Sequence, residues 1–106
     1  MHSVIRSYRL DDGDLDELMH RIDTDVAEKI AGEPGFVAYE CVKTGDDTLT
    51  TISTFSDEAG CERSNELAAE FVRNELSDMS VSRLGTDSGP VAVSRAAQEI
   101  LEPAHA

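Results

Sequence analysis

Hydrophobic residues in this 106-residue chain repeat with two different periods, and the order of those periods limits the fold. Residues 4–10 alternate between two faces, which is typical of a β-strand. Residues 15–30 carry an apolar residue at every third or fourth position, which predicts an amphipathic helix. Between them, Asp14 is a candidate helix N-cap and Glu17 occupies the capping-box position. The chain is therefore expected to begin with a strand followed by a helix.

The rest of the chain continues this pattern. In chain order we expect a strand at 36–44, a hairpin loop, a strand at 48–55, a helix at 57–76, a loop at 77–89 and a short strand at 90–94. The order is βαββαβ, which is that of the ferredoxin-like α+β fold with a four-stranded antiparallel sheet. We expect one such domain over residues 1–95 and a C-terminal tail over residues 96–106, with a helical turn near 96–101.

The segment 36–44 is apolar on both faces, interrupted mainly by Glu40. Two helices can cover only one face of a four-stranded antiparallel sheet, and the sequence indicates no third long helix. The simplest cover for the second face is the same sheet from another copy of the chain. The sequence therefore predicts a symmetric homodimer.

The chain is strongly acidic, with 9 Lys and Arg against 22 Asp and Glu and a formal net charge of −13. This balance argues against nucleic acid and anionic membrane surfaces as partners. No apolar run approaches the roughly 20 residues of a spanning helix, and no signal peptide is evident, so we expect a cytoplasmic protein. The scarcity of lysine suggests a salt-adapted source as one hypothesis; the simpler one is a repulsive surface that resists aggregation.

Motifs for cofactors and metals are absent from the sequence. It contains no Gly-rich phosphate loop, no metal-spaced histidine cluster and no nucleophile elbow. The two cysteines, Cys41 and Cys61, fit no zinc or redox spacing and are expected to be reduced thiols. We therefore expect no cofactor and no metal.

Four features follow one another between residues 4 and 93. They are the strand 4–10, the helix-ending Glu33-Pro34-Gly35-Phe36, the hairpin 44–49, and Phe55 followed by Ser56-Asp57-Glu58-Ala59. This pattern resembles the dimeric α+β-barrel superfamily, and most closely its antibiotic biosynthesis monooxygenase-like domains. The resemblance implies that two sheets form a barrel and that each subunit has a pocket between its sheet and helices. Some members oxygenate polycyclic aromatics or quinols with O₂ and without metal or flavin. Others degrade heme, isomerise small metabolites or have no known activity.

The histidines argue against heme degradation. Heme-degrading members of this fold use an Asn on the first strand, a Trp and an iron-ligating His. This chain has no Trp and no Asn in residues 4–10. We expect His2 and His105 in tails and His20 away from the apolar stripe of its helix.

Cofactor-free oxygenases of the superfamily are linked to an Asn, a Trp, a Tyr and an Arg around an aromatic substrate. The comparable residues here are Asn65, Tyr8, Tyr39 and Arg6, with Phe71 as an aromatic on the second helix. The Trp is missing, which weakens the oxygenase interpretation.

Arg6 and Tyr8 lie on one face of the first strand. If that face meets the helices, Arg6 could hold a phenolate or enolate oxygen and Tyr8 could donate a proton. If it meets the partner's sheet, Arg6 is a buried structural charge that needs an acid such as Glu40.

The second helix offers two further polar candidates. Asn65 could bind a carbonyl or O₂-derived oxygen, or simply hydrogen-bond a neighbouring loop. Glu75 could act as a base with a raised pKa, or lie partly exposed near the helix end.

Two functions of different classes remain. The first is a cofactor-independent monooxygenase that oxidises a quinol or polyketide-like aromatic; the alternative is a non-catalytic ligand-binding or stress-associated homodimer. A pocket of a few hundred Å³ with converging polar groups would favour the first. A pocket filled by Phe71, Leu67 and Tyr39 would favour the second.

Overall fold

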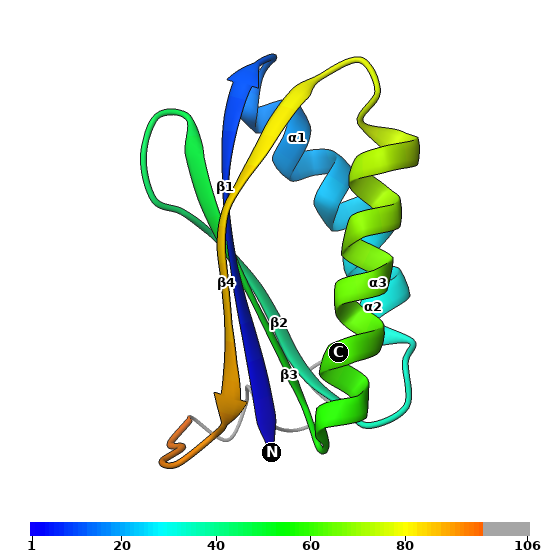
Figure 1. Ribbon diagram of the computed structural model, residues 1–106, viewed down its shortest axis with the longest axis vertical. Coiled ribbons are helices and arrows are strands. Elements are labelled where there is room, and N and C mark those ends of the chain that lie inside the picture. Colours follow the sequence, from blue (N-terminus) through cyan, green and yellow to red (C-terminus); the bar gives the residue numbers. More distant parts are fainter. Residues whose placement is uncertain (97–106) are drawn as a thin grey trace.

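A four-stranded antiparallel sheet with helices on one face makes up the computed structural model, which describes residues 1–96 (Figure 1). The strand order is β2-β3-β1-β4. The elements are β1 (His2–Asp12), α1 (Leu15–Arg21), a π-helical segment (Ile22–Val26), α2 (Ala27–Ala31), β2 (Phe36–Lys43), β3 (Thr48–Phe55), α3 (Glu58–Glu75) and β4 (Ser80–Pro90). This is the predicted ferredoxin-like α+β fold.

The fourth strand lies earlier in the chain than the sequence indicated. We predicted a loop over 77–89 and a strand over 90–94, and both predictions were wrong. The structure has β4 at Ser80–Pro90, paired with β1, and residues 91–96 form no helix or strand. This edge strand is largely exposed and polar between Gly85 and Gly89, so backbone pairing rather than a hydrophobic pattern defines it. The helical turn predicted near 96–101 lies outside the described residues, apart from residue 96.

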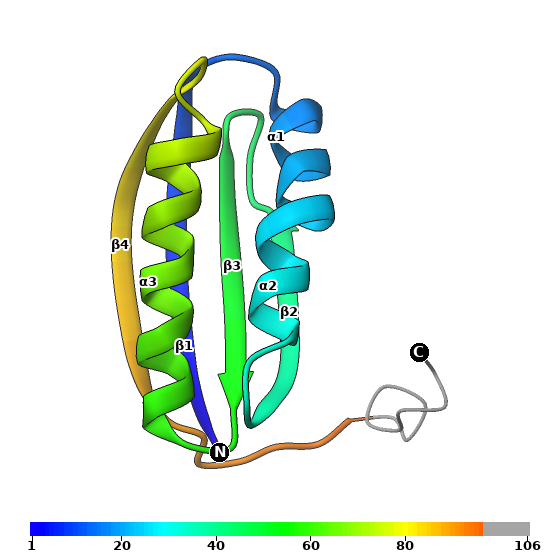
Figure 2. The same cartoon turned by 90° about the vertical axis from the view of Figure 1, so that its right-hand side faces the viewer.

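The helices form a single layer over the sheet. Figure 2 shows α3 in front of β1, α2 in front of β2, and β3 visible between the two helical regions. The hydrophobic core fills the space between the layers. Its least exposed members, each at most 2% exposed, are Val4, Leu18, Val26, Ile30, Leu49 and Phe55. None of the helices in residues 1–96 is long and apolar enough to cross a membrane.

The first helical region contains a π-helical turn that follows from its hydrophobic spacing. Leu18, Ile22, Val26 and Ile30 are four residues apart and all buried. An α-helix has 3.6 residues per turn, so a strict repeat of four drifts around it by about 40° per step. In the π-helical segment the Ala27 N–H donates to the Ile22 carbonyl, five residues back. This wider turn counters the drift and keeps all four side chains on the sheet.

The start of α3 is fixed against β3 by a close contact. The Asp57 carboxylate caps the helix by accepting a hydrogen bond of 3.0 Å from the Gly60 N–H. Gly60 lies against the ring of Phe55, where a Cβ atom would be 2.4 Å from the nearest ring carbon. Phe55 in turn packs edge-to-face on Phe36, with ring centroids 5.8 Å apart. Glycine at position 60 therefore allows the close helix-to-sheet approach.

The sheet face away from the helices is open in the single chain. In β2, Tyr39 and Cys41 pack against the core, whereas Val42 is 46% exposed. Ile5 in β1 and Leu84 in β4 are also exposed. The helices thus cover the apolar residues on one face of β2, and those on its other face are exposed in the single chain.

Candidate functional site

Arg6 lies on the central strand β1, on the face that carries the helices, and is only 1% exposed. Its Nη1 donates to Asn65 Oδ1 at 2.7 Å and to Ser64 Oγ at 3.2 Å, both on α3. Its Nη2 donates to Ser53 Oγ on β3 at 2.8 Å. Arg6 therefore connects three elements through uncharged acceptors.

The buried Arg6 charge has no acidic partner among residues 1–96. Its Nε is buried and has no hydrogen-bond partner there. Burial lowers the pKa of Arg6, but a guanidinium still remains protonated in proteins. Glu40, the acid considered in the sequence analysis, is exposed and paired with Ile52. A buried cation without a counter-charge is energetically costly, so Arg6 is a candidate anion-binding group.

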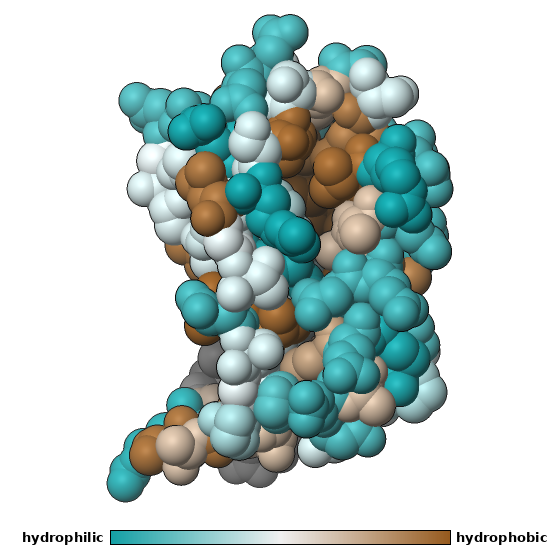
Figure 3. Space-filling view, viewed as in Figure 1, coloured by the Kyte–Doolittle hydropathy of each residue, from teal (hydrophilic) through white to brown (hydrophobic). Residues whose placement is uncertain are grey.

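Arg6 lies where a small interior cavity meets a larger cleft. The interior cavity, about 30 Å³, is lined by Arg6, Tyr8, Tyr39, Phe71 and apolar side chains of both helical regions. The cleft, about 310 Å³, shares Arg6 and Tyr8 with the cavity and adds Asn65, Arg73 and Arg83. Figure 3 shows a hollow with apolar walls between the β1–β4 side of the sheet and α3. The site thus has polar groups at the base of an apolar hollow.

Both tyrosines of the chain border the interior cavity. Burial raises the pKa of Tyr8, against the opposing positive charges of Arg6 and Arg83. Burial also raises the pKa of Tyr39. Both phenols are therefore neutral at pH 7, and each can donate a proton or hydrogen bond.

The structure brings together only some of the predicted site residues. Arg6, Tyr8 and Asn65 meet at the cleft, and Tyr39 and Phe71 line the cavity beneath it. Leu67 packs against the core but lines neither space.

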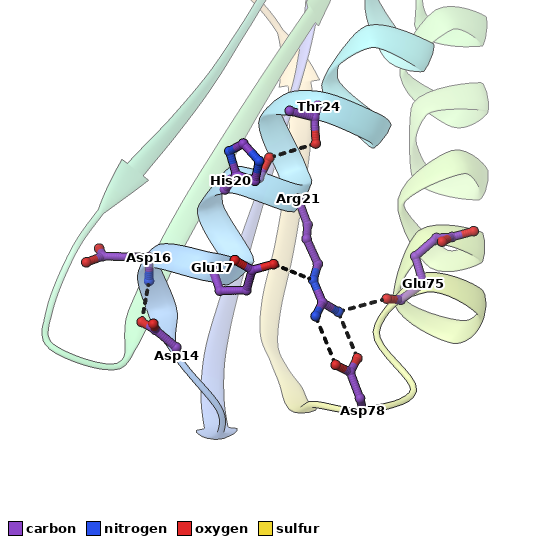
Figure 4. Close-up of polar contacts among 8 residues, drawn as sticks. All are labelled: Asp14, Asp16, Glu17, His20, Arg21, Thr24, Glu75 and Asp78. Atoms are coloured by element: carbon purple, nitrogen blue, oxygen red, sulfur yellow. Dashed lines mark hydrogen bonds and ion pairs between the residues drawn. The ribbon is translucent and has the colours of Figure 1, made fainter.

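Glu75 lies apart from this group. It is exposed at the end of α3, and its backbone carbonyl accepts a hydrogen bond of 3.2 Å from Arg21 Nη1. Its carboxylate points away from Arg21 (Figure 4). Glu75 lines a surface depression with Arg21 and Phe71 rather than the cleft of Arg6.

Arg21 ties α1 to the connection between α3 and β4. Its two terminal nitrogens bind both carboxylate oxygens of Asp78 at 2.7 and 2.9 Å, and its Nε donates to Glu17 at 3.1 Å (Figure 4). The same connection contains Leu76, which lines the interior cavity. We call this set, Arg21, Glu17, Glu75 carbonyl and Asp78, the Arg21 clasp.

Sequence reasoning missed four residues of the site. Ser53 alternates with the buried residues of β3 and could have been recognised as inward-facing. Arg73 lies two steps of four residues after Asn65 on α3, so helical spacing could have grouped the two. Ser64 lies three residues after Cys61 and four before Ala68, on the buried stripe of α3. No sheet face could be predicted for Arg83, because its segment, residues 77–89, was expected to be a loop.

No metal site is apparent in the part of the chain that the structure describes: no three His, Cys, Asp or Glu side chains cluster suitably in residues 1–96. Cys41 and Cys61 are both free thiols. Burial raises the pKa of each thiol, which disfavours the reactive thiolate.

Comparison with known proteins identifies relatives of the fold. No family model matches the chain, and no curated protein matches its sequence. Among solved structures it is similar to SnoaB, a cofactor-independent oxygenase from Streptomyces nogalater, with 11% identity and a TM-score of 0.67 over 88% of this chain and 94% of that one. It is also similar to a dimeric ferredoxin-like protein from an uncultured marine organism, with 11% identity and a TM-score of 0.69 over 91% and 98%.

A third similar structure is a protein of unknown function from Nitrosomonas europaea, with 16% identity and a TM-score of 0.71 over 91% of this chain and 93% of that one. At these identities the likeness shows the fold alone. The chain has the ferredoxin-like α+β fold, as do a protein described as dimeric and one described as an oxygenase.

Proposed function

We propose that the protein is a cofactor-independent oxygenase that binds an aromatic hydroxyl compound, such as a quinol or polyketide-like phenol, in the cleft between α3 and β4. The observation that carries this proposal is the buried Arg6 guanidinium, which has no acidic partner among residues 1–96 and an unpartnered Nε. A negatively charged ligand oxygen supplies the missing charge and acceptor. The similarity in fold to SnoaB supports the reaction class.

The two spaces suit different reactants. The cleft of about 310 Å³ is at the lower end of ordinary ligand pockets, about 300 to 1,000 Å³. The interior cavity of about 30 Å³ holds only about one or two water-sized molecules. An aromatic ring therefore occupies the cleft with its oxygen towards Arg6, and O₂ reaches it from the interior side.

The reaction needs no reductant beyond the substrate. For an anthrone, loss of a proton from the acidic CH₂ group gives an enolate whose oxygen is stabilised by Arg6. The enolate carbon passes one electron to O₂, and the resulting radical pair forms a C–O bond. The peroxide takes up a proton, and loss of water leaves a ketone. Overall, CH₂ and O₂ give C=O and H₂O, so the carbon supplies all four electrons.

The residues have distinct roles in this scheme. Arg6 lowers the pKa of the substrate and holds its oxygen, so the proton can leave to water at the cleft mouth. The neutral Tyr8 hydroxyl donates to the peroxide or to the substrate oxygen. Asn65 orients Arg6 through their 2.7 Å hydrogen bond. Glu75 is left out because its carboxylate does not line the cleft.

Oxygen uptake by chelator-treated protein tests this function, with anthrone first and then a panel of quinols. Wild type is expected to consume one O₂ per anthraquinone formed. Arg6→Gln is expected to lower kcat about 100-fold, the usual effect of removing one group that stabilises an oxyanion. Arg9→Gln is the matched control, because Arg9 is exposed on the same strand and its substitution removes the same positive charge.

Tyr8→Phe keeps the aromatic ring and removes only the hydroxyl, so it tests the site if Arg6→Gln does not fold. Circular dichroism establishes which variants are folded. No uptake above a heat-denatured sample would contradict the oxygenase proposal. Uptake unchanged in folded Arg6→Gln and Tyr8→Phe would contradict the assignment of these residues.

The narrow interior favours a second candidate function, non-catalytic ligand binding. A cavity of about 30 Å³ leaves little room for a reacting ring beneath Arg6. Binding of a phenol without oxygen uptake would support this alternative. The chain contains two tyrosines and no tryptophan, so intrinsic fluorescence reports directly on the site.

We also propose that the protein is a homodimer formed through the open sheet face. Exposed Ile5, Val42 and Leu84 support this, because one face of the sheet has no cover within the described residues. A similar structure is described as a dimeric ferredoxin-like protein. A second copy would bury these side chains against their equivalents.

A further inference from the structure

Two arginines that the proposed reaction does not use flank the mouth of the cleft. Arg73 is on α3, Arg83 is on β4, and both are exposed. Together with Arg6 they make three guanidinium groups around one cleft of about 310 Å³. Among residues 1–96, no acidic side chain lines this cleft. The hollow is therefore a basic site on an acidic protein.

A β-bulge places Arg83 on the cleft side. Arg6 pairs with Thr86, so regular pairing would put Leu84 opposite Tyr8. Instead the register shifts between Ser7 and Tyr8, and Tyr8 pairs with Arg83. Directly paired residues project from the same face of a sheet, so the bulge turns Arg83 towards the helices and Leu84 to the open face.

Arg73 reaches the same cleft from α3 by helical spacing. Asn65, Ala69 and Arg73 are each four residues apart, and all three line the cleft. Asn65 lies next to Arg6, so the row runs from the buried base of the cleft to its mouth. The small Ala69 leaves space between them.

The three arginines of the cleft form no ion pair within residues 1–96 of a protein that is rich in acids. Among the described residues, the cations in ion pairs are Arg9, Arg21, Lys29 and Arg63. The remaining five cations are unpaired there although the chain has 22 acids, and three of them, Arg6, Arg73 and Arg83, line one cleft. The other two, Lys43 and Arg95, do not line it. Cations kept away from abundant acids and gathered around a hollow are suited to an anionic ligand.

We propose that Arg73 and Arg83 form a carboxylate-binding subsite, so that the ligand is an aromatic acid. Its phenolic or enolic oxygen lies at Arg6, and its carboxylate lies between the two guanidinium groups at the mouth. This inference rests on the proposed function, because it uses the same cleft and the same orientation of the ring. It adds a required second anionic group at the far end of the ligand.

Titration calorimetry at pH 7 tests the subsite with three probes: 6-hydroxy-2-naphthoate, its methyl ester and 2-naphthol. The naphthoate carries its hydroxyl and carboxylate at opposite ends of one planar ring system. Wild type is expected to bind the acid about tenfold more tightly than the ester, the effect of one charge-assisted hydrogen bond. In Arg73→Gln/Arg83→Gln this preference is lost, while affinity for the ester stays the same.

Arg9→Gln is the control, because it changes the overall charge without touching the cleft. Retention of the preference in this variant supports a local subsite. Equal affinity of wild type for acid and ester would overturn the subsite but leave the proposed function standing. Loss of the preference in Arg9→Gln to the same extent would also overturn it, since a long-range field would then explain the effect. Failure of all three probes to bind would contradict the proposed function itself and, with it, the subsite.

Discussion

Arg6 donates a hydrogen bond of 2.7 Å to the side-chain amide of Asn65, which lies 59 residues away in the sequence. A guanidinium has only donors, so the atom of Asn65 that faces it is the oxygen. The amide nitrogen of Asn65 then has no hydrogen-bond partner among residues 1–96, and the residue lines the cleft. The Arg6 interaction thus presents two further donors to whatever occupies the cleft.

The two half-buried tyrosines, Tyr8 and Tyr39, predict a loss of stability in alkali. Their pKa values are raised on folding, so the unfolded chain releases these protons first, near pH 10. The stability is present below that pH and falls as pH rises through the folded pKa values. The free energy of unfolding, measured by denaturant titration from pH 8 to 11, is expected to decrease. Tyr39→Phe should reduce this decrease; tyrosinate absorbance with an ordinary midpoint in folded protein would contradict the prediction.

Gly60→Ala is expected to destabilise the protein by about 1–3 kcal/mol, because its Cβ would overlap the Phe55 ring. Gly85→Ala is the control, since a Cβ there meets no atom within 4 Å. Denaturant unfolding of both variants measures the difference. Equal stability of the two variants would show that α3 moves away from β3 at no cost.

Breaking the Arg21 clasp is expected to loosen the connection between α3 and β4. Arg21→Gln should lower the melting temperature more than Lys29→Gln, because Lys29 pairs only with Asp25 one turn away in the same helical region. A double-mutant cycle with Asp78→Asn isolates the pair. A coupling energy of zero would show that the clasp has no role in stability.

The proposed dimer predicts an effect of charge on the open sheet face. Ile5→Glu should produce monomers, because it places a charge in the contact with a second copy. Ala59→Glu adds the same charge at an exposed position of α3, away from the open sheet face, and should leave the dimer intact. Light scattering at micromolar concentration distinguishes the two. A stable, folded wild-type monomer would contradict the dimer.

Salt is expected to raise the melting temperature. The formal charge of −13 produces repulsion that ions screen, with a Debye length falling to about 3 Å at 1 M. Potassium chloride is the suitable salt, because sulfate stabilises most proteins by another mechanism. A flat or falling melting temperature between low and molar chloride would remove the salt-adaptation hypothesis.

The elements recognisable from sequence are those whose side chains face two different environments. The strand 48–55 was predicted with its observed bounds from its β-branched residues, and in the structure its buried and half-buried residues alternate. The helix predicted at 57–76 corresponds closely to α3, which begins after its Asp57 cap. β4 was misplaced because an exposed edge strand carries little hydrophobic pattern.

The candidate site could be predicted only in part for a related reason. Arg6 and Tyr8 were grouped by alternation, but the pattern left open which layer their face meets. Only the tertiary contacts with Ser53 and Ser64 settle that face. Arg83 depends on a bulge, and a one-residue shift in register leaves no signal in composition or period.

The π-helical segment shows that the spacing of apolar residues in a sequence can indicate where a helix is wider than an α-helix. Four buried residues are spaced four apart: Leu18, Ile22, Val26 and Ile30. The backbone widens at Ile22–Val26, and all four side chains therefore face the sheet. Deleting one residue from this segment would restore a regular α-helix and keep Ile30 facing the sheet, because the eleven steps then left between Leu18 and Ile30, at about 100° each, end within about 20° of three full turns. A homologous sequence that lacks one residue here should therefore keep the same apolar positions on either side of the gap, and a sustained repeat of four should itself signal a widened turn.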